Sequence, residues 1–483
     1  SDDYKMSDRE LRAKRLADWA EAFGRKRGPG EDVDFAASAG ALRDLLQKRL
    51  LSLTDLRDDP EYFFLAHRTI AEHGEALGAG FWTRFTVQFN LFAGTVLAVG
   101  NASQIASLEA MQAAGALGCF ALTEKFAGVS SGMVVETTAE FDAARNEFVI
   151  STPSEGAKKN WISQGFVADK AVVVADLRVG GASHGPHAFL MDFRVGGALA
   201  PGVRLADMGK KTVCNDLDNA WIAFDGVRVP RSALLDGQCS LDAAGTYRAA
   251  RPGVHPMEMI GQRLFTGRVA VAQSALVFGR WLFGKTREYA DNKLCWAPRG
   301  ARPPLSMLPQ LSALYDEADE AFEYAEGYAA ACERRLCAAL RAGEIPKPAL
   351  VEAIAVAKVR AVETVIRLCF RLKQAIGSYA LMKGSGFEEL DSMQIAKFAE
   401  GESFVLMQKL ARDRVKGSGG AVDAVGDDEA AIVEELKGAR TAEWLAKAEK
   451  VYALAELVMD RAMRAEVGAE IPKGVARPWA AKL

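Results

Sequence analysis

The chain has 483 residues, beyond the size at which one hydrophobic core stops growing, so we expect two or three packed sub-domains rather than a small binding module. Its 60 Lys and Arg residues against 63 Asp and Glu residues give a formal net charge of -3, which argues against nucleic-acid or anionic-membrane binding as its main activity. Hydrophobic residues make up 49% and charged residues 25% of the chain, the composition of a globular protein. The seven cysteines are scattered, without the paired spacing of a disulfide framework or a zinc ribbon.

The first segment, residues 1–117, predicts an N-terminal helical domain. It is rich in Ala and Leu, and we expect Asp8 and Asp58 as helix caps and Pro60 at a helix start. The most apolar stretch, residues 85–100, is too short to cross a bilayer. We therefore expect a buried helix there and no membrane span.

The second segment, residues 118–238, predicts a small β domain. Short runs rich in β-branched and aromatic residues alternate with Gly-Gly, Pro-Gly and Asp-Gly turn signals. The expected strands include residues 147–151, 171–175, 187–191 and 221–225.

The third segment, residues 239–420, returns to a helical pattern. Apolar residues recur every three or four positions in residues 351–370, which predicts one wall of a helix bundle. The charged residues of this helix are expected on its other face: Glu352, Lys358, Arg360, Glu363 and Arg367. The glycine-rich residues 416–420 predict a flexible link to a helical extension, residues 421–483. The predicted fold class is α+β: an N-terminal helical domain, a central small β-barrel or sandwich, and a C-terminal helical bundle.

Several common catalytic motifs are absent from the sequence. It contains no P-loop, no strand followed by Gly-x-Gly-x-x-Gly and a helix, and no Gly-x-Ser-x-Gly elbow. His184 and His187 are close in sequence, but Pro186 and the expected strand after it argue against a ligand-bearing helix. We expect no metal site.

Five short features follow one another in an informative order. They are Gly118-Cys-Phe-Ala-Leu-Thr-Glu124, Lys158-Lys-Asn-Trp-Ile-Ser163, Phe224-Asp-Gly-Val-Arg-Val-Pro230, Arg268 heading a long helix, and Phe398-Ala-Glu-Gly-Glu402. This order resembles the acyl-CoA dehydrogenase and acyl-CoA oxidase superfamily. The oxidase branch is the more similar, through Val87-Gln-Phe-Asn-Leu-Phe-Ala-Gly-Thr95, the first of these motifs and Glu136-Thr-Thr-Ala139. The resemblance covers residues 61–416, and the shared order makes it more specific than any single motif.

The resemblance implies a cofactor, FAD, held between the β domain and the C-terminal helical bundle, with an acyl-CoA thioester beside the flavin. It implies that Thr123 contacts the polar edge of the flavin and that Trp161 covers the ring. Ser163 would offer a hydroxyl where the dehydrogenases usually have Thr. The alternative is a tryptophan of the β-domain core beside two turn hydroxyls.

The resemblance also implies that Glu400 is the catalytic base, which removes the α-proton of the thioester while the β-hydrogen leaves as hydride to flavin N5. Gly401 would permit close approach of the backbone to the substrate, and Arg268 would contribute to substrate binding. The alternative is that Glu400 and Glu402 are merely acidic residues favoured at the N-terminus of a helix beginning near Ser403.

Three segments that bind the cofactor in the family have a different sequence here. Residues 126–131, Phe-Ala-Gly-Val-Ser-Ser, replace a Gly-x-Gly-Ser segment. Lys293 replaces an Arg that the resemblance implies reaches the FAD of a partner subunit in a homodimer or higher homo-oligomer, and Trp296, a further implied cofactor contact, replaces a Phe shortly after it. Lysine keeps the charge but loses the bidentate fork of arginine. On the adenine side, Gln374-Ala-Ile-Gly-Ser-Tyr-Ala380 replaces a glycine-rich loop, with Gln374 retained as a FAD contact.

The resemblance therefore implies an acyl-CoA oxidase, which forms a trans-2-enoyl-CoA and passes electrons from the flavin to O2 to give hydrogen peroxide. The alternatives are a dehydrogenase with a protein acceptor and, from another class, a non-redox descendant that binds acyl-CoA or a protein. The chain ends in Ala481-Lys482-Leu483, a variant of the Ser-Lys-Leu signal bound by a peroxisomal import receptor, so we expect a peroxisomal protein. About 80 residues follow Glu400, fewer than in the long oxidases, so we expect a shortened oxidase-like enzyme.

Overall fold

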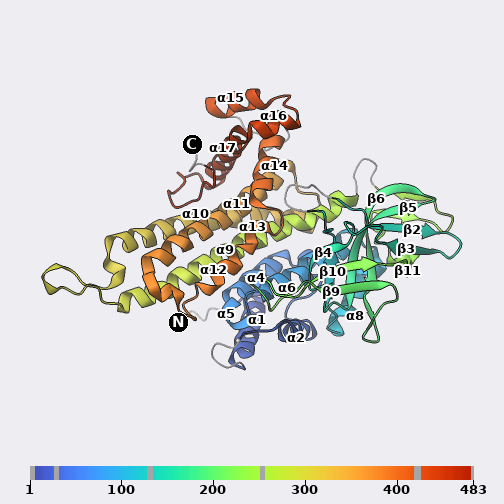
Figure 1. Ribbon diagram of the computed structural model, residues 1–483, viewed down its shortest axis with the longest axis horizontal. Helices are drawn as coiled ribbons and strands as arrows, with labels where there is room; N and C mark the ends of the chain where they lie inside the picture. Colours follow the sequence, from blue (N-terminus) through green and yellow to red (C-terminus); the bar gives the residue numbers. More distant parts are fainter. Residues whose placement is uncertain (1–5, 27–31, 128–133, 251–255, 418–425, 480–483) are drawn as a thin grey trace. The chain divides into compact units, whose positions relative to one another are not determined.

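The computed structural model describes residues 6–26, 32–127, 134–250, 256–417 and 426–479. Its internal contacts divide the chain into two compact units, Ser1–Leu264 and Phe265–Leu483. The first unit contains helices and then strands, and the second is helical (Figure 1). The expected α+β class and the helix, strand, helix order are confirmed. The finer division at residues 117, 238 and 420 stays a prediction.

The first unit begins with short helices whose start points follow from local capping. Ser7, not Asp8, caps the first helix through a capping box with Glu10, and Asp59, not Asp58, caps the helix that begins at Pro60. Both caps therefore lie one residue away from the expected position. The helices are α1 Asp8–Arg25, α2 Phe35–Gln47, α3 Asp55–Asp58, α4 Pro60–Glu72, α5 Gly74–Leu77, α6 Phe81–Thr86, α7 Ala93–Val99 and α8 Ala102–Ala113. The apolar stretch is helical as expected, with a π-helical segment, η1 Val87–Phe92, between α6 and α7.

The strands among the described residues of the first unit form one larger sheet and three smaller ones. The strands are β1 Gly118–Ala121, β2 Thr138–Asp142, β3 Glu147–Ser151, β4 Lys159–Ser163, β5 Lys170–Val179, β6 Ala182–Asp192, β7 Arg194–Val195, β8 Ala198–Leu199, β9 Val203–Asp207, β10 Asn219–Phe224, β11 Val227–Pro230, β12 Cys239–Leu241 and β13 Tyr247–Ala249. The long strand β5 pairs in parallel with β1 and then with β2, and antiparallel with β6. A three-stranded sheet in the order β4-β10-β9 carries Trp161 and Ser163.

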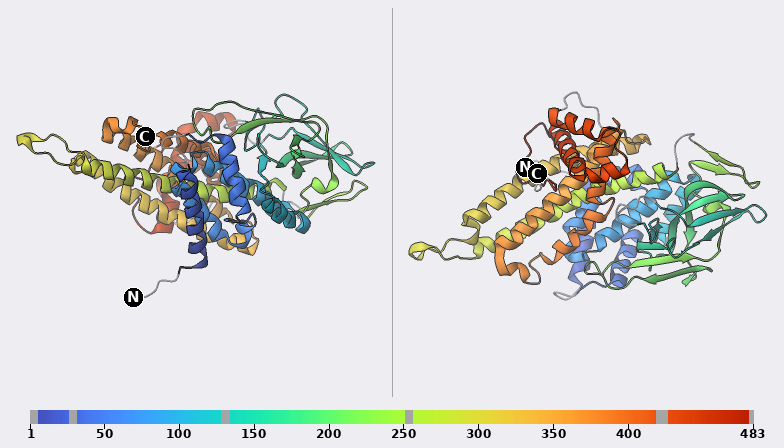
Figure 2. Two further views of the ribbon diagram at one scale, coloured as in Figure 1. Left: turned by 90° about the horizontal axis from the view of Figure 1, so that it is seen from below. Right: turned by 45° about the horizontal axis from the view of Figure 1, so that its top comes forward.

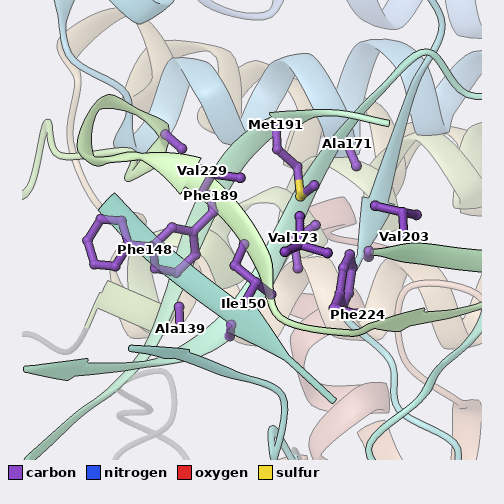
Figure 3. Packing of buried hydrophobic residues seen from close by; sticks show 14 of the residues in the cluster. Ala139, Phe148, Ile150, Ala171, Val173, Phe189, Met191, Val203, Phe224 and Val229 are labelled. Atoms are coloured by element: carbon purple, nitrogen blue, oxygen red, sulfur yellow. The ribbon is translucent and has the colours of Figure 1, made fainter. Parts of the chain in front are cut away.

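The core of the β region is filled by aromatic and branched side chains from several strands. Phe148, Phe189 and Phe224 project into it together with Ile150 and Val173 (Figure 3). The rings of Phe148 and Phe189 meet edge to face with centroids 5.1 Å apart. This packing fixes the strands that position the candidate residues.

The second unit is built from three long helices, α9 to α11, and from shorter ones among its described residues. They are α9 Pro256–Asn292, which begins before the unit boundary, α10 Pro309–Ala342, α11 Pro348–Ile376, α12 Glu388–Met393, α13 Ile395–Phe398, α14 Ser403–Val415, α15 Asp427–Leu436, α16 Thr441–Ala446 and α17 Ala448–Val467. Helices α10 and α11 lie side by side in both views of Figure 2. No helix among the described residues is both long enough and apolar enough to cross a membrane.

Helix α11 buries most of the charged residues that were expected on its second face. Every residue from Glu352 to Ile366 is buried, including Lys358 and Arg360, whose exposed fraction is 0%. The polar groups have partners inside the unit: Arg360 bonds Asp460, and Glu363 bonds Lys397. The helix is therefore central rather than a wall, because specific partners compensate its buried charges.

Candidate functional site

Glu400 lies in the turn between α13 and α14. Its backbone has φ 58°, and Gly401 follows with φ 108°, so two consecutive residues occupy the left-handed region. The next residue, Glu402, caps α14: its carboxylate accepts a hydrogen bond from the Val405 N–H at 2.9 Å. The expected helix start at Ser403 and the capping role of Glu402 are confirmed, and the two glutamates have different environments.

The Glu400 carboxylate is buried and confined. Its Oε2 is buried, with no hydrogen-bond partner among the described residues. The side chain lies against Gly267 of α9, where an added Cβ would come within 2.3 Å of the Glu400 Cδ. Burial raises the pKa of Glu400 from 4.5 to about 7, although the positive charges of Arg268 and Lys358 lower it. A carboxylate with this pKa is suited to accept a proton near neutral pH.

Two cations hold the backbone around Glu400. Arg268 lies well inside α9, not at its head as expected, and its Nε donates to the Glu400 carbonyl at 2.8 Å. The Lys358 amine donates to the carbonyls of Lys397 and Gly401 at 3.0 and 2.8 Å. The structure thus brings together Glu400, Gly401 and Arg268 and adds Lys358.

In the first unit, Trp161 lies at a β-bulge. Ile162 of β4 pairs with Ala220 of β10, and Lys159 pairs with Ile222. Two residues of β4 therefore lie opposite one residue of β10. Trp161 adopts φ 57°, and its side chain is 57% exposed, which is unusual for a large aromatic residue. Bulges of this kind often re-aim a side chain beside a functional site.

Thr123 and Ser163 lie on segments that meet at this bulge. The Thr123 carbonyl accepts the N–H of Asn160, next to Trp161, at 2.8 Å. Asn219 donates to Ser163 Oγ at 3.2 Å and to the Trp161 carbonyl at 3.4 Å. Thr123 is exposed and Ser163 half-buried, so Thr123 presents polar groups beside an exposed indole. The alternative, that Trp161 is a core residue of the β domain, is therefore wrong.

A buried ion pair supports these three residues and was not predicted. Lys159 Nζ lies 2.8 Å from Glu124 Oε1, and both side chains are at most 1% exposed. Lys159 also donates to the carbonyls of Leu122 and Val174, and the Glu124 carboxylate accepts the N–H of Thr137. Both residues stand in the quoted motifs, directly beside Thr123 and Asn160, but sequence gives no sign that they pair. Burial lowers the pKa of Lys159 to about 8.

The remaining predicted cofactor residues lie apart from Glu400 in the sequence and on exposed positions of the second unit. Lys293 follows the last residue of α9, and Trp296 is 81% exposed. Gln374 is exposed near the end of α11, and Tyr379 from its loop stacks on Tyr289 with centroids 3.7 Å apart. Ser130 and Ser131 lie outside the described residues. No cluster of three or more His, Cys, Asp or Glu side chains in the described ranges could hold a metal.

The helix, strand, helix fold can be compared with those of known proteins. Solved structures share this fold. Acyl-CoA oxidase 1 of Yarrowia lipolytica superposes with a TM-score of 0.75 at 18% identity, covering 95% of this chain and 76% of that chain. Butyryl-CoA dehydrogenase of Megasphaera elsdenii gives 0.65 at 18% identity, covering 86% of this chain and 100% of that one.

Sequence relatives agree with the fold. Peroxisomal acyl-coenzyme A oxidase 3 of Homo sapiens is 32% identical over 267 residues, which are 51% of this chain and 37% of that protein. Acyl-coenzyme A oxidase 2 of Yarrowia lipolytica is 31% identical over 303 residues, 58% of this chain and 42% of that protein. The chain thus matches less than half the length of these relatives, and no family model matches it. The expected resemblance to the acyl-CoA oxidase and acyl-CoA dehydrogenase superfamily is confirmed.

Proposed function

We propose that this protein is an FAD-dependent acyl-CoA oxidase. It would convert an acyl-CoA thioester to the trans-2-enoyl-CoA, with O2 as the electron acceptor and hydrogen peroxide as the product. The observation that carries the proposal is the Glu400 carboxylate, which is buried, unpartnered at Oε2 and shifted in pKa to about 7. The similarity to acyl-CoA oxidases supports the substrate class.

The residues of the β region fit a flavin. A flat heterocycle needs an exposed aromatic or apolar surface and polar groups at one edge, and Trp161 with Thr123 and Ser163 offers both. A solved relative from Caenorhabditis elegans, acyl-CoA oxidase 2, was bound with FAD, ascaroside-CoA and ATP; its TM-score is 0.73 at 19% identity, over 96% of this chain and 78% of that one. We assign Thr123, Trp161 and Ser163 to the flavin, with Lys293, Trp296 and Gln374 as further contacts.

Glu400 would act on the substrate as the general base. The α-proton of a thioester is only weakly acidic, so its removal requires a carboxylate that is poorly solvated and aimed at the carbon. The absence of hydrogen bonds to Oε2 leaves that oxygen available for the proton, and Gly401 lets the substrate approach the backbone closely. FAD, when bound, supplies the hydride acceptor. In this scheme Arg268 keeps the Glu400 backbone in place and contributes to the substrate site.

The proposal is tested on the purified protein. We expect yellow protein that is bleached by acyl-CoA without oxygen and that forms peroxide when air is admitted. Colourless protein that does not take up FAD would exclude a flavoenzyme and favour a non-redox binding protein.

A pair of variants tests the base. Glu400→Gln should retain flavin and lose bleaching by acyl-CoA, whereas Glu402→Gln, which keeps an oxygen to cap α14, should bleach normally. Bleaching by Glu400→Gln at the normal rate would remove Glu400 from this role.

A dehydrogenase is the second candidate. The superposition covers the whole of the butyryl-CoA dehydrogenase chain but only 76% of the acyl-CoA oxidase 1 chain, so the fold spans the full length of a dehydrogenase. If acyl-CoA bleaches the flavin but no peroxide forms when air is admitted, the protein is a dehydrogenase rather than an oxidase.

The assembly and the location are part of the same proposal. We expect a homodimer or higher homo-oligomer in which Lys293 and Trp296 contact the FAD of the partner subunit; sedimentation of the flavin-loaded protein tests this.

We also expect import into peroxisomes through Ala481-Lys482-Leu483, which lies outside the described residues. Relatives named as peroxisomal support this expectation. A fusion with a fluorescent protein at the N-terminus should enter peroxisomes, and deletion of Leu483 should abolish entry.

A further inference from the structure

Lys358 is the most deeply buried charged group near Glu400 and has no role in the reaction described so far. Its exposed fraction is 0%, and it stands in the middle of the central helix α11. Burying a lysine amine is costly, so a buried lysine requires compensating contacts. Those contacts go to the turn that carries Glu400.

The two hydrogen bonds of Lys358 enclose Glu400. One goes to the carbonyl of Lys397, three residues before Glu400, at 3.0 Å, and the other to the carbonyl of Gly401, the residue after it, at 2.8 Å. The Glu400 carbonyl between them accepts from Arg268. The left-handed backbone of Glu400 and Gly401 is therefore tied at three carbonyls by two cations from different helices.

We propose that Lys358 is a positioning residue for the Glu400 base: its amine fixes the turn from both sides and so aims the carboxylate. The inference rests on the proposed function, because it assigns Lys358 to the same acid–base step. Strained turns persist only where the surrounding structure over-determines them, and the Lys358 amine supplies part of that restraint. Lysine can do this whether charged or neutral, since it has two protons even in the neutral form.

Lys358 also acts on Glu400 through its charge. Its positive charge lowers the pKa of Glu400, and burial lowers the pKa of Lys358 itself to about 7. The charged groups facing Lys358 are Glu363 of the same helix, Arg268 of α9, Glu400 and Glu402, with Lys397 paired to Glu363. Removal of the amine should therefore move the titration of Glu400 to higher pH as well as loosen its turn.

The test compares Lys358→Met with Arg367→Met. Arg367 is a matched control because it is also a cation of α11 that donates to two backbone carbonyls, those of Lys473 and Gly474, at 3.1 and 2.7 Å. Two quantities are measured: the rate at which acyl-CoA reduces the bound flavin without oxygen, and the protonation of Glu400 followed by infrared difference spectroscopy, with Glu400→Gln identifying its band.

We expect Lys358→Met to retain flavin, to reduce it roughly 100-fold more slowly, as for a displaced catalytic group, and to titrate Glu400 at higher pH. Arg367→Met should keep the wild-type rate and titration, and Lys358→Arg should recover most of the rate.

An unchanged rate and titration in Lys358→Met would overturn the inference, as would equal effects in Arg367→Met. If Lys358→Met does not fold, Lys358→Gln replaces it with the same expectations. If acyl-CoA fails to reduce wild-type flavin, the proposed function fails, while the infrared titration still decides whether Lys358 controls Glu400.

Discussion

The backbone of Glu400 adopts φ 58°, a conformation that costs a non-glycine residue free energy. The same residue buries a carboxylate oxygen that has no hydrogen-bond partner among the described residues. Glu402, two positions later, has ordinary extended geometry and a satisfied carboxylate. Glu400 thus has both a strained backbone and a buried, unpaired oxygen, whereas Glu402 has neither. This difference favours a functional role for Glu400.

The raised pKa of Glu400 predicts how folding stability depends on pH. Well below pH 4.5, the carboxyl is protonated in both the folded and the unfolded state, so the raised pKa does not affect the free energy of unfolding. Above about pH 7 the folded protein must ionise the buried group, and the shift from 4.5 to about 7 then costs about 3 kcal/mol at most. Relative to Glu400→Gln, which does not titrate, wild-type stability should fall as pH rises through this range. Urea unfolding of both proteins at the two ends of the range measures the difference, and a pH-independent difference would contradict the shift.

Gly267 predicts a second effect at the same carboxylate. A Cβ at this position would meet Glu400 Cδ at 2.3 Å and Oε1 at 2.5 Å, so the carboxylate must move in Gly267→Ala. We expect the rate of flavin reduction to fall roughly 10- to 100-fold with flavin still bound. Gly284→Ala on the same helix meets nothing within 4 Å and should reduce flavin at the wild-type rate. Equal rates for the two variants would show that Glu400 adapts to the added methyl.

At the scale of the element, the start of α14 depends on Glu402. Its carboxylate accepts the Val405 N–H, one of the unpaired donors of the first turn. Glu402→Ala should lower the free energy of unfolding by about 1 kcal/mol, and Glu402→Ser, a favoured cap, should largely restore it. Denaturant unfolding of the three proteins measures this. A loss in Glu402→Ser as large as in Glu402→Ala would indicate that the charge, not the cap, stabilises the turn.

The elements show what a sequence pattern can predict and where it stops. Strand β3 has the expected bounds, residues 147–151, because alternating apolar residues between turn signals specify a strand locally. The burial of Lys358 was not predictable, because it depends on carbonyls about 40 residues away in the sequence. For the same reason the bulge at Trp161 was missed: the extra residue of β4 exists only relative to β10.

At the scale of the whole molecule, the motif order assigned candidate site residues to both units of the chain. Thr123, Trp161 and Ser163 are in the first unit, and Glu400 is in the second. The resemblance identified these positions because each motif is a short local sequence. The groups that hold them, the Glu124–Lys159 pair and Lys358, act through tertiary contacts, which leave no local sequence pattern. The sequence motifs thus nominate candidate reacting groups, which stay predictions, but they do not indicate the groups that hold them in place.

The end of the described chain is part of the second unit, and this predicts a sharp limit to truncation. The fully buried Arg360 donates to the Ala476 carbonyl at 2.6 Å, and the Ala476 N–H donates to Thr364 at 2.8 Å. Trp479 packs on Tyr452 with centroids 4.3 Å apart.

Deletion of residues 473–483 would remove these hydrogen bonds from the buried Arg360 and Thr364, at about 1 to 3 kcal/mol each. We expect that deletion to lower the Tm of the protein by several degrees, in line with a loss of roughly 3 kcal/mol or more. Deletion of residues 480–483 alone removes none of these contacts and should leave the Tm unchanged. Thermal unfolding followed by circular dichroism compares the two. Equal Tm values would mean that the bundle is stable without this segment, and that the contacts of Arg360 with the helix α17 suffice to hold it.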